Sequence, residues 1–312
     1  MENVINKNHR LNKKKVKKDT AEKIFWAILI LPAVAIVALF ILVPIVDSVI
    51  KSFTNYTLVN IIKDIPVKWN NFENYKILLE RGVLGNAVGN TLIFVLGEVV
   101  CSFVIGLALA LLLNANIKGA RFFRSIMMTP WVVPTVISAL VWNWIFQPQY
   151  GLFRYLVNFI TGGQVSDFAI LNNKSTALLG VGIAALWKQI PLMTLLLLAG
   201  LQNVPEDIME AAKIDGASGA TRLVKITIPY MKSVIKVAVS MSIIENFKQF
   251  PLFWQMTGGG PDGATTTLAV LSYQEAFIEH NLGSGAAVTT IWMLIMVVVV
   301  LFYNRIFKNE EM

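Results

Sequence analysis

A short run of polar side chains interrupts the apolar stretch at residues 233–257. Ser242, Glu245, Asn246 and Gln249 recur every three or four residues, which places them on one face of a helix. A hydroxyl, a carboxyl and two amides can donate and accept hydrogen bonds together, which suits the hydroxyl groups of a sugar. The same residue types also join neighbouring membrane helices by hydrogen bonds. This polar stripe therefore predicts either a solute pathway or a helix–helix contact.

A second candidate lies in the apolar stretch at residues 177–201. Ionisable side chains are costly at the centre of a bilayer, so Lys188 is a functional candidate. Pro191 cannot donate a backbone hydrogen bond and loosens the helix there, and discontinuous helices often mark binding sites in transporters. Trp187 or Phe247 could offer an aromatic face to a sugar ring.

Glu98 is a further ionisable residue within an apolar stretch. It is either a pathway group or the partner of a lysine such as Lys248, and we favour the partner role.

Membrane-spanning helices must position these side chains. The chain of 312 residues is 55% hydrophobic and 15% charged, whereas a soluble domain carries about 25% charged residues. Six apolar segments are long enough for the roughly 20 residues that a bilayer core requires. The expected fold is an all-α polytopic membrane protein with spans near 24–50, 87–113, 122–147, 177–201, 233–257 and 284–304.

The distribution of lysine and arginine orients these spans. With the N-terminus inside, the inside segments carry 18 lysines and arginines and the outside segments carry 7. Such a bias predicts that both termini are cytoplasmic. Residues 1–23 then form a basic cytoplasmic tail, residues 202–232 a cytoplasmic loop, and residues 305–312 the cytoplasmic C-terminus. The first apolar segment is a full span with no cleavage site after it, so no signal peptide is expected.

Several kinds of chemistry are not expected from this sequence. Cys101 is the single cysteine, and His9 and His280 fall on opposite sides of the predicted membrane, so no metal site is expected. The glycine-rich turn at 257–263 is not followed by Gly-Lys-Ser or Gly-Lys-Thr, and no P-loop occurs elsewhere. Without a hydrolase or metalloprotease motif, an enzyme is not expected.

The loop at 202–232 predicts two short helices. Pro205, Glu206 and Asp207 suit a first helical turn. Gly216 suits a helix end, and Ser218 can cap the next helix. One face of the first helix is apolar, formed by Ile208, Ala211 and Ala212. This block is either an ordinary helical hairpin or a docking surface for a partner groove.

The spacing of Glu210-Ala211-Ala212, Gly216, Ile226 and Pro229 resembles the EAA motif of binding-protein-dependent ABC importer permeases, with Ile228 replacing the usual leucine. Several further segments resemble the maltose and glycerol-phosphate branch of that family. They are Thr129-Pro-Trp131, Leu198-Ala-Gly-Leu201, Asp215-Gly216-Ala217, Ile226-Thr-Ile-Pro229 and Thr257-Gly-Gly-Gly-Pro261. The resemblance extends over nearly everything from residue 24 onward.

The resemblance implies a type I ABC importer permease in the cell membrane. Its implied partners are a second permease, two cytoplasmic ATPases and an external solute-binding protein. ATP and Mg²⁺ would be bound by the ATPases, and no cofactor is implied for this chain. The residues implied in ATPase coupling are Glu210, Ala211, Ala212, Asp215 and Gly216.

The resemblance also implies a substrate pathway lined by the spans on either side of the EAA loop. The matching residues are Lys188, Gln189, Leu192, Ser242, Glu245, Asn246 and Gln249, with Gln249 replacing an asparagine. Lys188 and Glu245 depart from the uncharged maltose site, and could pair with each other or contact a charged sugar. The resemblance leaves two alternatives open: the sugar site lies in this chain or in its partner permease.

The expected function is therefore ATP-driven import of a carbohydrate, with an oligosaccharide as the expected cargo, by alternating access. The alternatives are an ABC permease for another solute, such as a phosphate ester or a peptide, and a secondary transporter that works without ATPases.

Overall fold

The computed structural model describes residues 22, 25–115, 119–162 and 169–308. Over these residues the chain is helical, and the β-pairing they contain is an isolated bridge between Thr54 and Trp69. The all-α prediction is confirmed. The chain divides into two units, residues 1–51 and 52–312, which we describe separately.

The first unit carries one long apolar helix, Phe25–Lys51, which includes the π-helical turn η1 (Ala38–Leu42) and α2 (Val43–Lys51). It occupies the range expected for the first span. None of its most apolar window is buried within the chain. A helix that is apolar on all sides is stable only in lipid or against another apolar surface.

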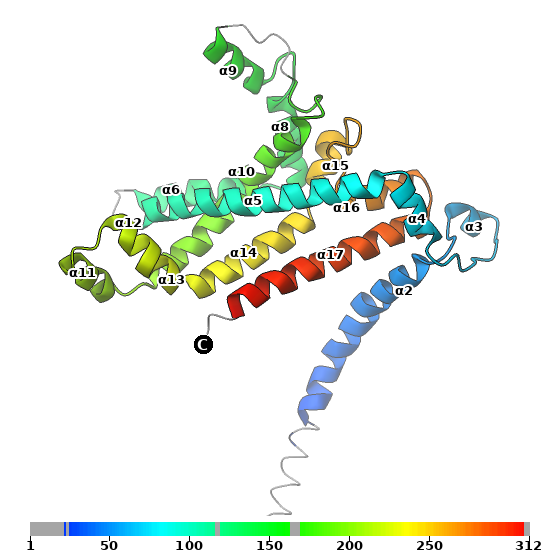
Figure 1. Cartoon of the computed structure of the whole chain (residues 1–312), viewed down its shortest axis with the longest axis horizontal. Helices are drawn as coiled ribbons and strands as arrows, with labels where there is room; N and C mark the ends of the chain where they lie inside the picture. The colour runs from blue at the N-terminus through cyan, green and yellow to red at the C-terminus, as the bar shows by residue number, and fades with distance from the viewer. Residues whose placement is uncertain (1–21, 23–24, 116–118, 163–168, 309–312) are drawn as a thin grey trace, which may run out of the picture. The chain divides into compact units, whose positions relative to one another are not determined.

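Three long helices dominate the second unit: α5 (Val83–Asn114), α10 (Ala177–Gln202) and α17 (Leu282–Lys308). They match the spans expected at 87–113, 177–201 and 284–304. Figure 1 shows α5, α14 and α17 running side by side, and α10 packs along α5. The close approach of α5 and α10 depends on Gly106, because a Cβ atom there would lie 2.8 Å from the Met193 side chain.

The third expected span is broken rather than continuous. It consists of α6 (Ala120–Met127), α7 (Thr129–Val132) and α8 (Thr135–Ile145), with a bend of 95° before α8. Val133 is extended because Pro134 follows it, and a residue before proline is disfavoured in the helical conformation. The bend leaves the carbonyl groups at the end of α7 without partners in the next helix.

The fifth expected span is also divided. Helix α14 (Lys232–Phe247) is separated by residues 248–250 from α15 (Pro251–Thr257). Proline suits the first position of a helix, because its missing N–H group has no partner there in any case. The two halves share one buried cluster, in which Phe247 of α14 and Phe253 of α15 pack with Phe94 of α5.

The remaining helices are short. Those predicted to lie outside the membrane are α3 (Leu58–Ile62), α4 (Glu73–Glu80), α9 (Leu152–Thr161), and α16 (Leu268–Tyr273), which continues as η3 (Gln274–Ile278). The loop between α10 and α14 contains α11 (Glu206–Ile214), α12 (Gly219–Arg222), η2 (Leu223–Thr227) and α13 (Ile228–Tyr230). In the described residues four helices are long and apolar enough to cross a membrane, or six spans if each of two bent helix pairs counts as one.

Candidate functional site

The centre of the polar stripe is a small hydrogen-bond network between α10 and α14. The amide of Asn246 donates to the carbonyl oxygen of Ser242 at 2.9 Å and to its hydroxyl at 3.3 Å. The amide of Gln189 reaches the same hydroxyl from α10 at 3.3 Å. Ser242 and Asn246 are buried, whereas Gln189 is half-buried. The helical spacing correctly predicts that Ser242 and Asn246 share one face of α14. The bond from Gln189 joins the spans on either side of the loop at 202–232.

Lys188 lies one residue away but takes a different partner. Its ammonium group donates to the carbonyl oxygen of Val133 at 2.6 Å and lies 3.5 Å from that of Pro130. These carbonyls belong to the end of α7, where the bend in span three leaves them free. Lys188 therefore holds the broken helix against α10.

Glu245 pairs with Lys248 at 2.7 Å rather than with Lys188, so the pair considered in the sequence is not formed. Both side chains of the observed pair are about half exposed, at 54% and 53%. Charged groups in a membrane span usually face an aqueous cavity or another protein chain. The exposed face of α14 near Glu245 therefore meets something other than lipid.

The remaining predicted pathway residues lie near this network. Gln249 is half-buried in the break between α14 and α15, and Leu192 is half-buried on α10. Trp187 is half-buried and meets Trp142 edge-on, with ring centroids 6.0 Å apart. The suggestion that Phe247 offers its ring to a sugar is wrong, because that side chain is fully enclosed in the core.

Glu98 is buried between α5 and α10. Its Oε1 atom lies near Gly182, and its Oε2 atom has no hydrogen-bond partner among the described residues. The predicted contact with Lys248 is wrong, because Lys248 pairs with Glu245. Glu98 instead lines a largely apolar cavity of about 320 Å³.

The loop between α10 and α14 begins with α11, whose first turn contains Glu206 and Asp207 as expected. Pro205 precedes the helix instead of lying in its first turn. Gly216 has a positive φ of 77°, and the N–H of Ala217 donates to the carbonyl of Ala212 at 2.9 Å. This bond closes the helix as a left-handed glycine cap does.

The second part of the loop is capped as the sequence predicts. The Ser218 hydroxyl accepts a hydrogen bond from the N–H of Thr221 at 3.2 Å. Thr227 of η2 returns to α11, where its hydroxyl lies 3.9 Å from the sulfur of Met209. The two short helical segments of this block, residues 202–232, therefore touch at this point.

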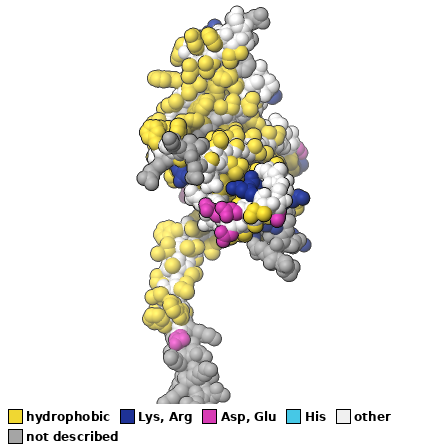
Figure 2. Space-filling model, turned by 90° about the vertical axis from the view of Figure 1, so that its left-hand side faces the viewer, with side chains coloured by type: hydrophobic (Ala, Val, Ile, Leu, Met, Phe, Trp, Pro, Cys, Tyr) yellow, Lys and Arg dark blue, Asp and Glu magenta, His cyan; other side chains and the backbone are white. Residues whose placement is uncertain are grey.

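Four of the five predicted coupling residues are exposed on this block: Glu210, Ala211, Asp215 and Gly216. Ala212 is buried and faces inward. Ile214, which no sequence motif indicates, is 86% exposed beside the Gly216 turn. Figure 2 views the end of the molecule that carries α11 and shows acidic and basic side chains gathered there below an extensive hydrophobic area.

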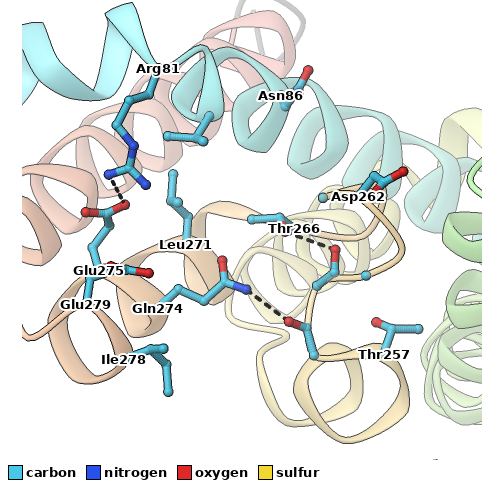
Figure 3. Close-up of a pocket in the computed structure, with 15 residues that line it drawn as sticks. Arg81, Asn86, Thr257, Asp262, Thr266, Leu271, Gln274, Glu275, Ile278 and Glu279 are labelled. Atoms are coloured by element: carbon cyan, nitrogen blue, oxygen red, sulfur yellow. Dashed lines mark hydrogen bonds and ion pairs between the residues drawn. The ribbon is translucent and has the colours of Figure 1, made fainter.

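A pocket of about 580 Å³ lies at the opposite end of α5. It is bounded by the start of α5, the glycine-rich turn and the α16–η3 helix (Figure 3). Gln274 donates to the carbonyl of Gly258 at 3.0 Å, and Thr266 donates to that of Gly259 at 3.0 Å. These bonds fix the turn, and Gly259 has a φ of 97° that side chains rarely tolerate.

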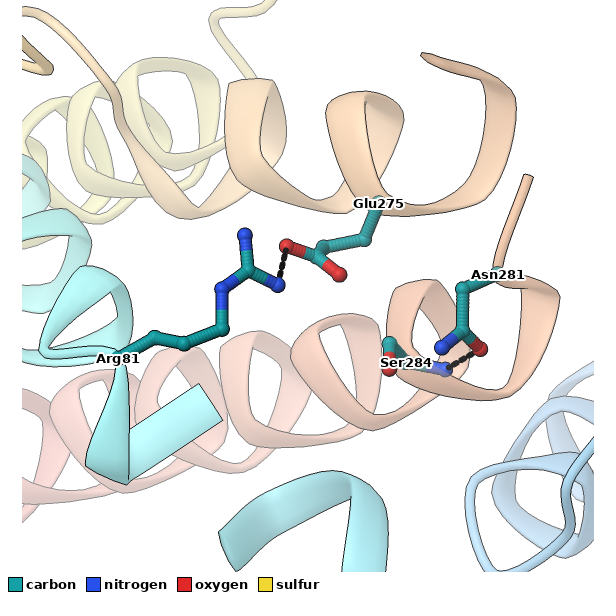
Figure 4. A network of polar contacts seen from close by, with 4 residues as sticks. All are labelled: Arg81, Glu275, Asn281 and Ser284. Carbon is teal, nitrogen blue, oxygen red and sulfur yellow. Dashed lines mark hydrogen bonds and ion pairs between the residues drawn. The ribbon is translucent and has the colours of Figure 1, made fainter. Parts of the chain in front are cut away.

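An ion pair crosses this pocket. Arg81 Nη1 lies 2.8 Å from Glu275 Oε1 (Figure 4), and the arginine side chain is 45% exposed while the glutamate is 3% exposed. Burial raises the pKa of the Glu275 carboxyl, and the charge and hydrogen bond of Arg81 oppose that rise. The backbone carbonyl of Glu275 also accepts from the N–H of Asn281, whose side chain accepts from the N–H of Ser284. No motif in the sequence predicts this ion pair.

Known sequences match the chain over most of its length. It is 36% identical over 275 residues to the trehalose/maltose transport system permease protein MalF of Thermococcus litoralis, which covers 88% of this chain and 90% of that protein. It is 31% identical to the multiple sugar-binding transport system permease protein MsmF of Streptococcus mutans, over 92% of this chain and 96% of that protein.

A chain of a solved bacterial ABC transporter involved in import of the acidic polysaccharide alginate has the same fold, with a TM-score of 0.78 and 19% identity, over 95% of this chain and 99% of that one. Residues 102–309 match the family model described as the inner membrane component of binding-protein-dependent transport systems. This match includes the loop at 202–232 and the polar network. The chain belongs to that family of membrane permease components.

Proposed function

We propose that this chain is a permease subunit of an ABC importer that carries a carbohydrate, with an oligosaccharide as the expected cargo. The observation that carries the proposal is the Gln189–Ser242–Asn246 network. It presents hydroxyl and amide groups within two apolar helices, in a chain similar to permeases named for trehalose, maltose and multiple sugars. Polar groups of this kind orient a hydroxyl-rich solute.

The energy for transport comes from other subunits in this proposal. The sequence contains no P-loop, and the partners are two cytoplasmic ATPases that bind ATP and Mg²⁺. The exposed residues Glu210, Ala211, Asp215 and Gly216 contact an ATPase, with Glu210 in its cleft. Ala212 supports the packing of α11 from the inner side.

The block at residues 202–232 runs directly into α14, and this connection couples movement of the ATPases to the solute pathway. Helix α13 bends into α14 by 74°, and α14 carries Ser242 and Asn246. A displacement of α11 by the ATPases moves α14 against α10 and switches the pathway between inward- and outward-facing states. A second permease forms the other side of the pathway, and an external binding protein delivers the solute. Such a two-state change driven from a remote site is the general requirement for allosteric coupling.

The proposal is tested by solute selectivity of the complete complex in proteoliposomes. Labelled disaccharides and tetrasaccharides, glycerol phosphate and a short peptide are supplied to complexes of both permeases, the ATPases and the cognate binding protein. We expect ATP-dependent uptake of a saccharide and none of the other two solutes. Uptake of the phosphate ester or the peptide alone would contradict the carbohydrate assignment.

A further inference from the structure

Four aromatic side chains form one continuous surface beside the break in span five. Phe250 lies in the break, Trp254 on α15, Tyr273 at the end of α16, and Phe277 in η3. The rings of Phe250 and Trp254 are nearly parallel, with centroids 5.9 Å apart. Tyr273 lies 4.6 Å from Trp254 and 5.0 Å from Phe277. We call these four side chains the aromatic platform.

The aromatic platform is open on one side. Phe250 and Trp254 pack partly against the buried core and are half-buried. Phe277 is 59% exposed. Within the part of the chain that the structure describes, neither the Tyr273 hydroxyl nor the Trp254 indole N–H makes a hydrogen bond. Tyrosine and tryptophan usually satisfy these groups when they are buried, so both groups here are available to a ligand.

The platform adjoins the polar stripe directly. Gln249, the last residue of the stripe, precedes Phe250 in the chain, and both are half-buried. Lys248 and Glu245 form their half-exposed ion pair just before this point. A charged pair within the predicted fifth span indicates that the neighbouring surface meets water or protein rather than lipid.

We propose that the aromatic platform is a saccharide-binding subsite next to the polar stripe, and this inference rests on the proposed carbohydrate transport. The C–H face of a pyranose ring is apolar and can stack on an aromatic ring, while its hydroxyl groups reach polar atoms at the ring edge. Sites for small molecules commonly combine aromatic walls with a few placed polar groups. A saccharide longer than the stripe then spans both, with one unit on the polar network and the next on the platform.

An anchoring role at the membrane surface is the competing explanation, because aromatic residues are enriched where lipid meets water. The two roles differ in one measurable respect. A stacking subsite affects a long saccharide more than a short one, whereas a lipid anchor affects insertion of the protein and every solute equally.

The test compares uptake of a disaccharide and a tetrasaccharide by complete complexes in proteoliposomes, using a panel of α-linked, β-linked and uronate saccharides. The variants are Trp254→Leu and Phe277→Leu, and Phe277→Tyr serves as a conservative rescue. Phe159→Leu is the control, because Phe159 is an aromatic residue on α9 that is more exposed than Phe277, at 79% against 59%, and lies outside the platform. ATPase assembly and basal ATP hydrolysis are measured on the same samples.

We expect each leucine variant to reduce tetrasaccharide uptake by about two- to tenfold, the range expected for the loss of one aromatic contact. Disaccharide uptake should fall less, and Phe277→Tyr and Phe159→Leu should behave as wild type. Unchanged tetrasaccharide uptake, or an equal loss for both saccharide lengths, would overturn the subsite while leaving the proposed function intact. A wild-type complex that takes up no saccharide of the panel would contradict the proposed function and the subsite together.

Discussion

Asn246 makes the most direct connection between a single side chain and the proposed cargo. Its amide is buried and holds both the carbonyl and the hydroxyl of Ser242. Replacing a buried amide by an apolar side chain is costly, because the groups that were hydrogen-bonded to the amide lose their partner.

Replacing Asn246 by leucine should therefore reduce saccharide uptake by about tenfold or more, with the complex still assembled. Initial uptake rates in proteoliposomes measure the effect. Asn172→Leu, an exposed asparagine in the loop before α10, is the control and should have little effect. Normal uptake by the Asn246 variant would place the substrate site in the partner permease.

Lys188 makes a hydrogen bond within the chain, so its ammonium group is not free to bind a solute in this structure. Its ammonium group binds the carbonyls at the end of α7, with 2.6 Å to Val133. Replacing Lys188 by methionine keeps the length of the side chain but leaves these carbonyls without that donor.

We expect Lys188→Met to lower the free energy of unfolding by about 1–3 kcal/mol, as for the loss of a hydrogen bond from a charged donor. Thermal unfolding of the detergent-purified complex measures this. The order of preference among saccharides should not change. A stable variant with altered saccharide preference would show instead that Lys188 contacts the cargo.

The ion pair of Arg81 and Glu275 predicts a pH-dependent effect. In an Arg81→Gln variant the buried carboxyl loses the partner that opposes the rise in its pKa. The folded state then holds its proton more tightly than the unfolded state, so stability falls as pH rises above the pKa of the unfolded carboxyl.

The variant should thus lose more stability relative to wild type at about pH 8 than at about pH 5. We expect a loss of about 1–3 kcal/mol at the higher pH, because Arg81 is partly exposed and screened. Lys76→Gln is the control, since Lys76 and Glu80 are both largely exposed and 3.8 Å apart. A pH-independent loss would contradict the role of the Glu275 charge.

At the scale of elements, the block between α10 and α14 carries the coupling proposal. It exposes Glu210 on α11 and the apolar side chain of Ile214 beside the Gly216 turn. An exposed apolar residue next to charged residues is typical of a surface that binds a partner protein.

Glu210→Lys should weaken ATPase binding and uncouple transport while membrane insertion is preserved. Co-purification of the ATPases and the ratio of transport to ATP hydrolysis measure the two effects. Glu80→Lys, a largely exposed glutamate on α4, serves as the matched control and should leave both unchanged. A Glu210→Lys complex that purifies whole and transports in step with ATP hydrolysis would show that the docking claim is wrong.

Much of the element structure could be predicted because its signals are local. The lengths of the apolar runs predict α5, α10 and α17, and Gly216 and Ser218 predict the helix end and cap. Helical spacing also brings Ser242 and Asn246 together on α14. The other two members of the stripe depart from it, because Glu245 pairs with Lys248 and Gln249 lies in the break after α14.

The features that could not be predicted depend on tertiary geometry. The contact of Lys188 with α7 requires a bend of 95° in span three. Pro134 predicts a break in the helix there but not the angle of the bend. Arg81 and Glu275 are separated by 194 residues and meet only because the turn between α4 and α5 lies beside η3. Ile214 belongs to no sequence motif, and only the fold shows that it is exposed beside the Gly216 turn.

At the scale of the whole molecule, the sequence and the fold indicate a chain that works within an assembly. The helix Phe25–Lys51 exposes apolar side chains on all sides. The Glu245–Lys248 pair and the block at residues 202–232 are also exposed in the isolated chain. A second permease, the ATPases and the membrane account for these surfaces in our proposal.

The central claim is that this chain moves a carbohydrate with energy from ATP hydrolysed by other subunits. Its most direct test is uptake of a labelled saccharide by proteoliposomes that contain the complete complex, with ATP inside the vesicles and the binding protein outside. The account predicts uptake that requires ATP, the ATPases and the binding protein, and that persists when ion gradients are dissipated. Uptake driven by an ion gradient in the absence of ATP and the ATPases would contradict it.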